Sequence, residues 1–130
     1  MNNEKSLTRN QTLVLGVLTK SGAPLSAYDI LDRLRAEGIK APLQVYRALE
    51  VLIDRGITHR LESLNAFVAC ADINCQHNKM TGFVICEKCG KADEFLDNSL
   101  HNRIKKIAGA QGFQPVHSVV EIIGVCAKCA

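Results

Sequence analysis

The chain has 130 residues, 47% of them hydrophobic and 22% charged, and its formal net charge is +3. This composition is typical of a soluble globular protein, and so small a positive charge permits nucleic-acid binding without indicating it. No apolar run approaches the about 18 residues of a membrane-spanning helix, and the polar start lacks the hydrophobic region of a signal peptide. We therefore expect a cytoplasmic protein with no membrane partner, whose six cysteines serve metal or redox chemistry rather than disulfides.

The first half of the chain predicts three helices. Thr8 can cap a helix over residues 8–20, and Ser26 followed by Asp29 forms a capping-box start for a second helix. A proline at a first helical position opens a third helix over residues 42–55, which a glycine ends. Each helix carries apolar residues at the spacing of one helical face, as a packed helical domain requires.

Two short extended runs follow the helices, over residues 57–61 and 66–69, with a tight turn between them. Three helices followed by a β-hairpin are the plan of a winged helix-turn-helix. In that fold the third helix enters the major groove and the hairpin lies along the DNA backbone. The pattern by itself also permits a small helical domain that binds another protein through the solvated face of its third helix.

Polar residues on and around the third helix are the candidates for DNA contact. Arg47 is the candidate for direct base contact, because bidentate pairing of arginine with guanine is the commonest specific interaction. Gln44 lies off the apolar stripe and Tyr46 lies near its edge, where Tyr46 could touch a thymine methyl group or a phosphate. Lys40 before the helix and Arg60 in the hairpin are candidates for phosphate contacts.

Two C-x-x-C pairs, Cys86 with Cys89 and Cys126 with Cys129, organise the second half of the chain. A tight turn at this spacing can aim two thiolates at one ion, and two pairs fill the tetrahedron of a structural zinc site. The four cysteines are therefore predicted to hold one zinc ion. A redox pair is the weaker interpretation, because it needs a helix after its first cysteine and only one residue follows the second pair.

The segment between the pairs is longer than the about 15–20 residues of a compact zinc ribbon, so a small α+β unit should fold there. Strands are predicted over residues 81–86, 91–95 and 113–123, with a helix over residues 98–108 whose apolar side chains face inward. The last strand is long and strongly β-forming, which predicts pairing with a second copy of the chain. The expected parts are a winged-helix DNA-binding domain over 1–70, a hinge loop over 71–80 and a zinc-stabilised dimerisation domain over 81–130.

Several of these stretches resemble one protein family. Residues 44–49 read Q-V-Y-R-A-L and are similar to the recognition-helix motif of the ferric uptake regulator family. The wing at 58–62, the segment 83–90 and the stretch 112–129 match the same family. The resemblance extends over nearly the whole chain from Leu7 and implies a dimeric, metal-responsive transcription factor. The additional N-terminal helix that is usual in the family is missing.

Within the family, the zinc-responsive branch is the most similar. The resemblance implies a second, regulatory zinc site, whose ligands match His59, Cys70, His77 and Glu94 in this chain. Imidazole, thiolate and carboxylate ligands together suit Zn²⁺, and a thiolate disfavours Mn²⁺. The residues just before the first C-x-x-C lack the histidines that are usual in iron-sensing relatives.

The resemblance implies a zinc-responsive repressor that binds palindromic operator DNA as a homodimer and controls zinc-uptake genes. One structural and one regulatory zinc ion per chain are expected. The alternative in the same family is an iron-, manganese- or peroxide-sensing repressor. From other classes, a thiol switch built on Cys70 and Cys75 stays open. A zinc enzyme is disfavoured, because the H-x-E run of deaminases is missing and no nucleophile–base pair stands out. Cys75 and His117 have no settled role.

Overall fold

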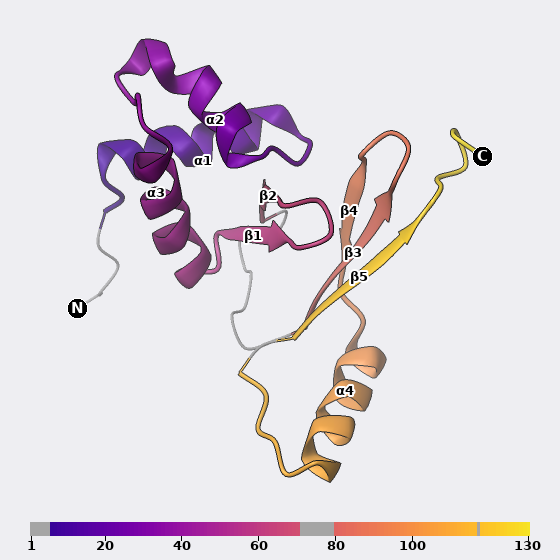
Figure 1. Ribbon diagram of the computed structural model, residues 1–130. Helices are drawn as coiled ribbons and strands as arrows, with labels where there is room; N and C mark the ends of the chain where they lie inside the picture. The colour runs from indigo at the N-terminus through magenta and orange to yellow at the C-terminus, as the bar shows by residue number, and fades with distance from the viewer. Residues whose placement is uncertain (1–5, 71–79, 117) are drawn as a thin grey trace. The chain divides into compact units, whose positions relative to one another are not determined.

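The computed structural model describes residues 6–70, 80–116 and 118–130 and divides into two compact units, Met1–Cys75 and Gln76–Ala130 (Figure 1). Within the described residues, no helix is long and apolar enough to cross a membrane. Three residues that the sequence singled out, Cys75, His77 and His117, lie outside the described residues.

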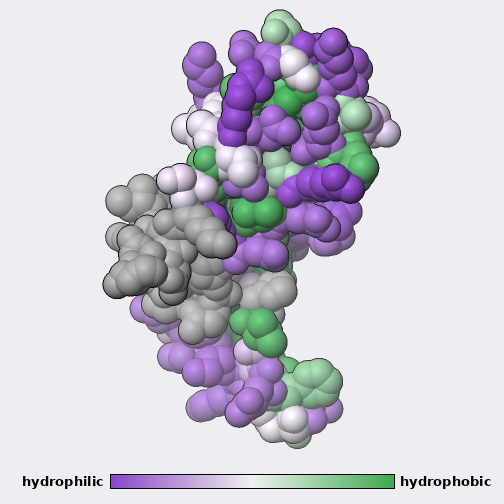
Figure 2. All heavy atoms as spheres, turned by 90° about the vertical axis from the view of Figure 1, so that its left-hand side faces the viewer, coloured by the Kyte–Doolittle hydropathy of each residue, from purple (hydrophilic) through white to green (hydrophobic). Residues whose placement is uncertain are grey.

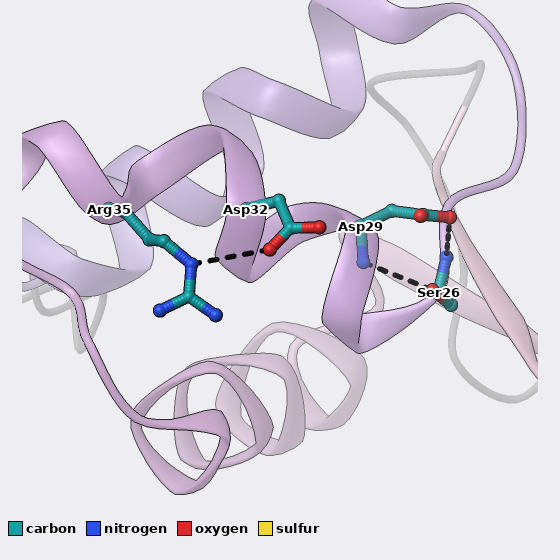
Figure 3. A network of polar contacts seen from close by, with 4 residues as sticks. All are labelled: Ser26, Asp29, Asp32 and Arg35. Carbon is teal, nitrogen blue, oxygen red and sulfur yellow. Dashed lines mark hydrogen bonds and ion pairs between the residues drawn. The ribbon is translucent and has the colours of Figure 1, made fainter.

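Helices form most of the first unit, and their boundaries follow the predicted caps. The Thr8 hydroxyl accepts a hydrogen bond from the Gln11 N–H, and the Gln11 side chain accepts one from the Thr8 N–H. Ser26 and Asp29 form the same reciprocal pair (Figure 3), at 3.1 and 3.2 Å. These caps satisfy N–H groups that have no partner within the helix. The elements are α1 (Arg9–Ser21), α2 (Ala27–Leu34), the 3-10 helix η1 (Arg35–Glu37) and α3 (Pro42–Asp54).

The three α-helices of the first unit enclose its core, and a two-stranded wing completes it. β1 (Thr58–Leu61) and β2 (Ala66–Ala69) are antiparallel, with Thr58 opposite Ala69. Leu25 and Phe67 exchange two backbone hydrogen bonds of 3.0 and 2.8 Å, which join the wing to the chain before α2. The winged helix-turn-helix prediction is therefore confirmed. The buried helical residues include Val14, Leu18, Ile30, Leu31, Leu34, Val45, Ala48, Leu49 and Leu52.

The second unit contains a three-stranded sheet and one helix. Its elements are β3 (Met80–Cys86), β4 (Ala92–Phe95), α4 (Asn98–Ala110) and β5 (Ser118–Gly124). The strand order is β4-β3-β5, with β4 antiparallel and β5 parallel to β3. β5 is shorter than predicted, because its pairing with β3 begins at Ser118 opposite Met80, the first residue of β3. Residues 113–116 form no strand.

The apolar face of α4 is only partly covered within the second unit, although it was expected to face inward: Leu100 and Ile104 are half-buried. None of its residues is buried, and Ile107 is 56% exposed. Val119, Ile122 and Ile123 of β5 are also about half exposed. Among the described residues of this unit, the buried hydrophobic ones are only Met80, Phe83, Ile85 and Cys86. So small a core leaves the unit dependent on further sources of stability.

Alanine in place of Gly82 should destabilise the second unit. Gly82 is buried in β3 opposite Phe95 of β4, and a Cβ atom there would overlap the Phe95 ring. Moving the ring should cost about 1–3 kcal/mol of unfolding free energy, measured by denaturant unfolding. Gly109→Ala is the matched control, because nothing lies within 4 Å of a Cβ atom at this helical position. It should leave stability unchanged or raise it by up to about 1 kcal/mol. Equal effects of the two substitutions would contradict the role of Phe95.

Candidate metal centres and nucleic-acid interface

The sheet of the second unit brings the two C-x-x-C pairs together. Cys86 is the last residue of β3 and lies opposite Gly124 of β5, and Cys126 follows two residues later. Because these strands are parallel, both pairs start at the same end of the sheet. The Glu87 N–H donates to the Gly124 carbonyl at 2.8 Å, which fixes the two chain segments beside each other.

The four sulfur atoms fit a tetrahedral zinc site. All four cysteines are free thiols, and their Sγ atoms lie within 4.8 Å of one another. The Sγ atoms of Cys89 and Cys126 are 3.9 Å apart. A Zn–S bond of about 2.3 Å places the sulfurs of a regular tetrahedron about 3.8 Å apart. Four thiolates leave no open position, so the group is suited to holding structure rather than to catalysis.

Two of these thiols have pKa values that are shifted in opposite directions by their surroundings. The N–H groups of Cys126 and Cys89 donate to the Cys86 Sγ at 3.3 and 3.5 Å and lower the pKa of Cys86 to about 6. Interaction with the Cys126 thiol, and then with the Cys86 thiol, raises the pKa of Cys129 to about 12. Since the ligand is the thiolate, zinc binding must displace the proton that Cys129 retains at neutral pH.

Two further residues whose side chains can bind metal ions, His59 and Cys70, lie at the base of the wing. His59 belongs to β1, and Cys70 directly follows β2 and donates its backbone N–H to the Ile57 carbonyl at 2.8 Å. Their ligand atoms lie within 4.8 Å of each other, and both residues are half-buried. Cys70 is disulfide-bonded, against the expectation that the cysteines form no disulfides. A cysteine in this state offers no thiolate to a metal.

The other two predicted regulatory ligands lie outside the described part of the first unit. Glu94 belongs to β4 of the second unit, where it is half-buried and lies opposite Phe83 of β3. His77 lies outside the described residues. The four-residue regulatory set therefore stays a prediction.

These observations agree with the comparisons with known proteins. The family model described as "Ferric uptake regulator family" matches residues 2–123. The chain belongs to the ferric uptake regulator family.

Two groups of relatives within the family match well. The zinc uptake regulation protein of Escherichia coli is 36% identical over 124 residues, which are 95% of this chain and 72% of that protein. The ferric uptake regulation protein of Legionella pneumophila is 35% identical in an alignment of 119 positions, which covers 81% of this chain and 86% of that protein.

Solved structures of the family share the fold. The crystal structure of holo XcZur has 42% identity and a TM-score of 0.84, over 95% of this chain and 85% of that one. A zinc uptake regulator in complex with zinc and DNA has 35% identity and a TM-score of 0.88, over 95% and 83% of the two chains.

Three of the residues predicted to contact DNA belong to α3, and two of them lie on its exposed face. Arg47 and Tyr46 are exposed, and the buried residues of α3 lie on its other face. Figure 2 shows hydrophilic side chains over most of the visible face of the first unit, with only small hydrophobic areas between them. A cavity of about 360 Å³ lies between the start of α1 and α3 and is lined in part by Gln44 and Arg47. Side chains of α3 are thus accessible to a groove of DNA.

Two of the DNA candidates already have partners within the protein. The Gln44 Oε1 accepts hydrogen bonds from the backbone N–H groups of Lys40 and Ala41, at 3.0 and 3.2 Å, and so caps α3. The Arg60 guanidinium donates to Glu62 at 3.2 Å and to Asn65 at 3.0 Å, across the tip of the wing. Gln44 therefore has a structural role, and Arg60 must leave or share its partners to reach a phosphate.

One interaction had no signal in the sequence. The His101 Nδ1 of α4 accepts a hydrogen bond of 3.3 Å from the backbone N–H of Met80, at the start of β3. His101 is half-buried, whereas its position in an amphipathic helix gave no reason to expect a bond to a distant strand. Only the packing of α4 beside the sheet makes this contact.

Proposed function

We propose that this chain is a zinc-responsive transcriptional repressor that binds palindromic operator DNA as a homodimer and controls zinc-uptake genes. The main support is its likeness, over 95% of its length, to zinc uptake regulators, one of them solved with zinc and DNA. The cysteine cluster fits a zinc ion independently of this likeness. Members of the family found in the comparisons are regulators, which favours regulation over an enzyme activity.

Two zinc ions per chain are proposed, with different roles. Cys86, Cys89, Cys126 and Cys129 would hold a structural ion that stabilises the second unit. His59, Cys70, His77 and Glu94 would hold the regulatory ion. Their mixed nitrogen, sulfur and oxygen donors favour zinc, and the thiolate disfavours manganese. This donor set is the reason to prefer zinc over the iron-, manganese- and peroxide-sensing alternatives.

The regulatory residues would couple zinc to DNA binding. His59 and Cys70 belong to the DNA-binding unit, whereas Glu94 belongs to the second unit. Holding one ion with residues of both units restricts the arrangements that the units can adopt. Regulation requires that the arrangement competent for DNA binds zinc better than the others. It also requires Cys70 in the reduced state, since the disulfide withholds its sulfur.

The DNA contacts would come from α3, the residue before it and the wing. Arg47 would read a guanine in the major groove, and Tyr46 and Gln44 lie on the same helix. Lys40 and Arg60 would contact phosphates and fix the register of the protein on the duplex.

A homodimer would supply the second recognition helix that a palindromic operator needs. β5 is at the edge of the sheet. Some apolar side chains of β5 and α4 are about half exposed in the single chain, namely Val119, Ile122, Ile123 and Ile107. An edge strand with exposed apolar residues favours pairing with another copy. Burial of these side chains would also add to the small core of the second unit.

Zinc counted per chain tests the proposal. The reduced wild-type protein should hold two zinc ions and keep one after mild chelation, with its circular dichroism unchanged and its zinc-dependent operator binding lost. Cys70→Ser should hold one ion before and after chelation. A reduced wild-type protein with one ion that never leaves would preserve the structural site and refute the regulatory one.

A further inference from the structure

The cavity between the start of α1 and α3 presents hydrogen-bond donors and no carboxylate. Its volume is about 360 Å³, and no Asp or Glu side chain lines it. Its polar lining comes from Thr8, Asn10 and Gln11 at the start of α1 and from Gln44 and Arg47 of α3. Both segments belong to the first unit, so the cavity lies within one compact unit. What the cavity can bind depends on which of these polar groups already have partners.

Three of these side chains accept hydrogen bonds from backbone N–H groups and so cap their helices. Thr8 and Gln11 cap α1 at 3.2 and 3.0 Å, and Gln44 caps α3 through its Oε1. The side chains of Asn10 and Arg47 have no hydrogen-bond or ion-pair partner among the described residues. Asn10 is half-buried, where an amide without a partner is unfavourable. The cavity therefore offers the Asn10 amide, the Arg47 guanidinium and the Nε2 of Gln44 as donors.

The surroundings of the cavity favour an anion. The first turns of α1 and α3 contain no acidic residue, although an acidic side chain stabilises a helix at that position. The first turn of α2, which does not line the cavity, contains Asp29. Arg9 donates to the Glu37 carbonyl at 2.7 Å and lies 4.0 Å from the Glu37 carboxylate, so this cation is already engaged. Free donors without a negative lining charge suit an anionic acceptor.

The position of the cavity points to a DNA phosphate as this anion. Arg47, the candidate for reading a guanine, is exposed on α3 and also lines the cavity. Phosphates border the major groove in which a recognition helix lies, and asparagine is among the side chains that bind them. We propose that Asn10 is a further DNA-contact residue, whose amide donates a hydrogen bond to a phosphate oxygen beside α3. This contact fixes the position at which Arg47 meets the base edges. The inference rests on the operator binding proposed above.

Asn10→Ala removes the donor and leaves a good helix-forming residue. The reduced, zinc-loaded full-length protein is titrated with operator and with unrelated DNA by fluorescence anisotropy, over a range of salt concentrations. The substitution should weaken binding to both DNAs alike, by about tenfold, as the loss of a hydrogen bond to a charged group does. The salt dependence should stay unchanged, because a neutral side chain releases no counterions. Lys40→Ala should instead reduce the salt slope.

Asn10→Asp separates the contact from the folding of α1. The carboxylate has nearly the shape of the amide but repels a phosphate, so affinity for both DNAs should fall by about 100-fold. The same carboxylate lies in the first turn of α1 and should maintain or raise the melting temperature. Thr12→Asp is the matched control, because Thr12 is exposed on α1 and does not line the cavity. It should lower affinity by less than about threefold, since solvent screens an exposed charge.

The outcomes distinguish this inference from the proposed function. A wild-type protein that binds operator no better than unrelated DNA would contradict the proposed function itself. If the wild type prefers the operator, full affinity of Asn10→Ala and Asn10→Asp refutes the phosphate contact. An Asn10→Asp protein that binds as well as Thr12→Asp refutes it too. A loss for Asn10→Ala that depends on one operator base pair would assign Asn10 to a base edge and overturn the phosphate contact. If Asn10→Ala melts below the wild type, the comparison of Asn10→Asp with Thr12→Asp decides.

Discussion

Cys86→Ser should abolish the structural zinc site and unfold the second unit. Cys86 is the buried member of the cluster and receives two N–H···S hydrogen bonds. Serine offers no thiolate, and structural zinc contributes about 10–16 kcal/mol of apparent binding free energy in small zinc-dependent domains. The described part of this unit buries few hydrophobic residues, so its core should not compensate for the lost ion. The number of zinc ions per chain should fall by one. The backbone amides of β3 and β5 should lose their protection from hydrogen exchange.

Cys70→Ser is the matched control, because it also removes one sulfur but lies in the first unit. It should leave structural zinc and the protection of β3 and β5 unchanged, while the regulatory ion is lost. The winged helix should stay folded in both variants, since its own core is extensive. A Cys86→Ser protein that keeps a chelation-resistant ion and an ordered sheet would refute the four-cysteine site.

Arg47→Ala should reduce the preference for operator over unrelated DNA. Arg47 is exposed on α3, and a bidentate arginine–guanine contact contributes about 1–3 kcal/mol of discrimination. The ratio of operator to non-operator affinity should therefore fall by about 5- to 150-fold, whereas the salt dependence changes little beyond one charge. Fluorescence anisotropy with zinc-loaded protein, repeated over a range of salt concentrations, measures both quantities.

Two further variants define what Arg47 does. Lys40→Ala should weaken binding to all sequences alike and reduce the salt slope by about one, as the loss of a phosphate contact does. Arg33→Ala removes an exposed charge from α2 outside the proposed interface and should change neither quantity. An Arg47→Ala protein with full operator preference would show that another residue reads the bases.

Local residue spacing predicted the helices and the wing of the first unit well. The caps at Thr8 and at Ser26 with Asp29 form as expected, because a capping box needs only residues three positions apart. The apolar residues of α3, which recur at the spacing of one helical face, are buried as predicted. The family motif in α3 was likewise readable, since it consists of consecutive residues.

Residues far apart in the sequence were predicted less completely. The two C-x-x-C pairs indicated one tetrahedral site, but only the parallel pairing of β3 with β5 explains how they meet. The start of β5 was misjudged, because this strand begins where its pairing with β3 begins and not where the β-forming residues begin. The exposure of α4 was also missed, since helical periodicity marks an apolar face but not what covers it.

By itself the sequence determined the element types of this protein, its family and the chemistry of its ligands. These depend on residue identity and on spacing within a few positions. The tertiary structure decided which sulfurs meet, that Gln44 caps α3, and that His101 holds Met80. Each of these depends on the direction of a side chain or on a strand neighbour distant in sequence, and local periodicity carries no information about either.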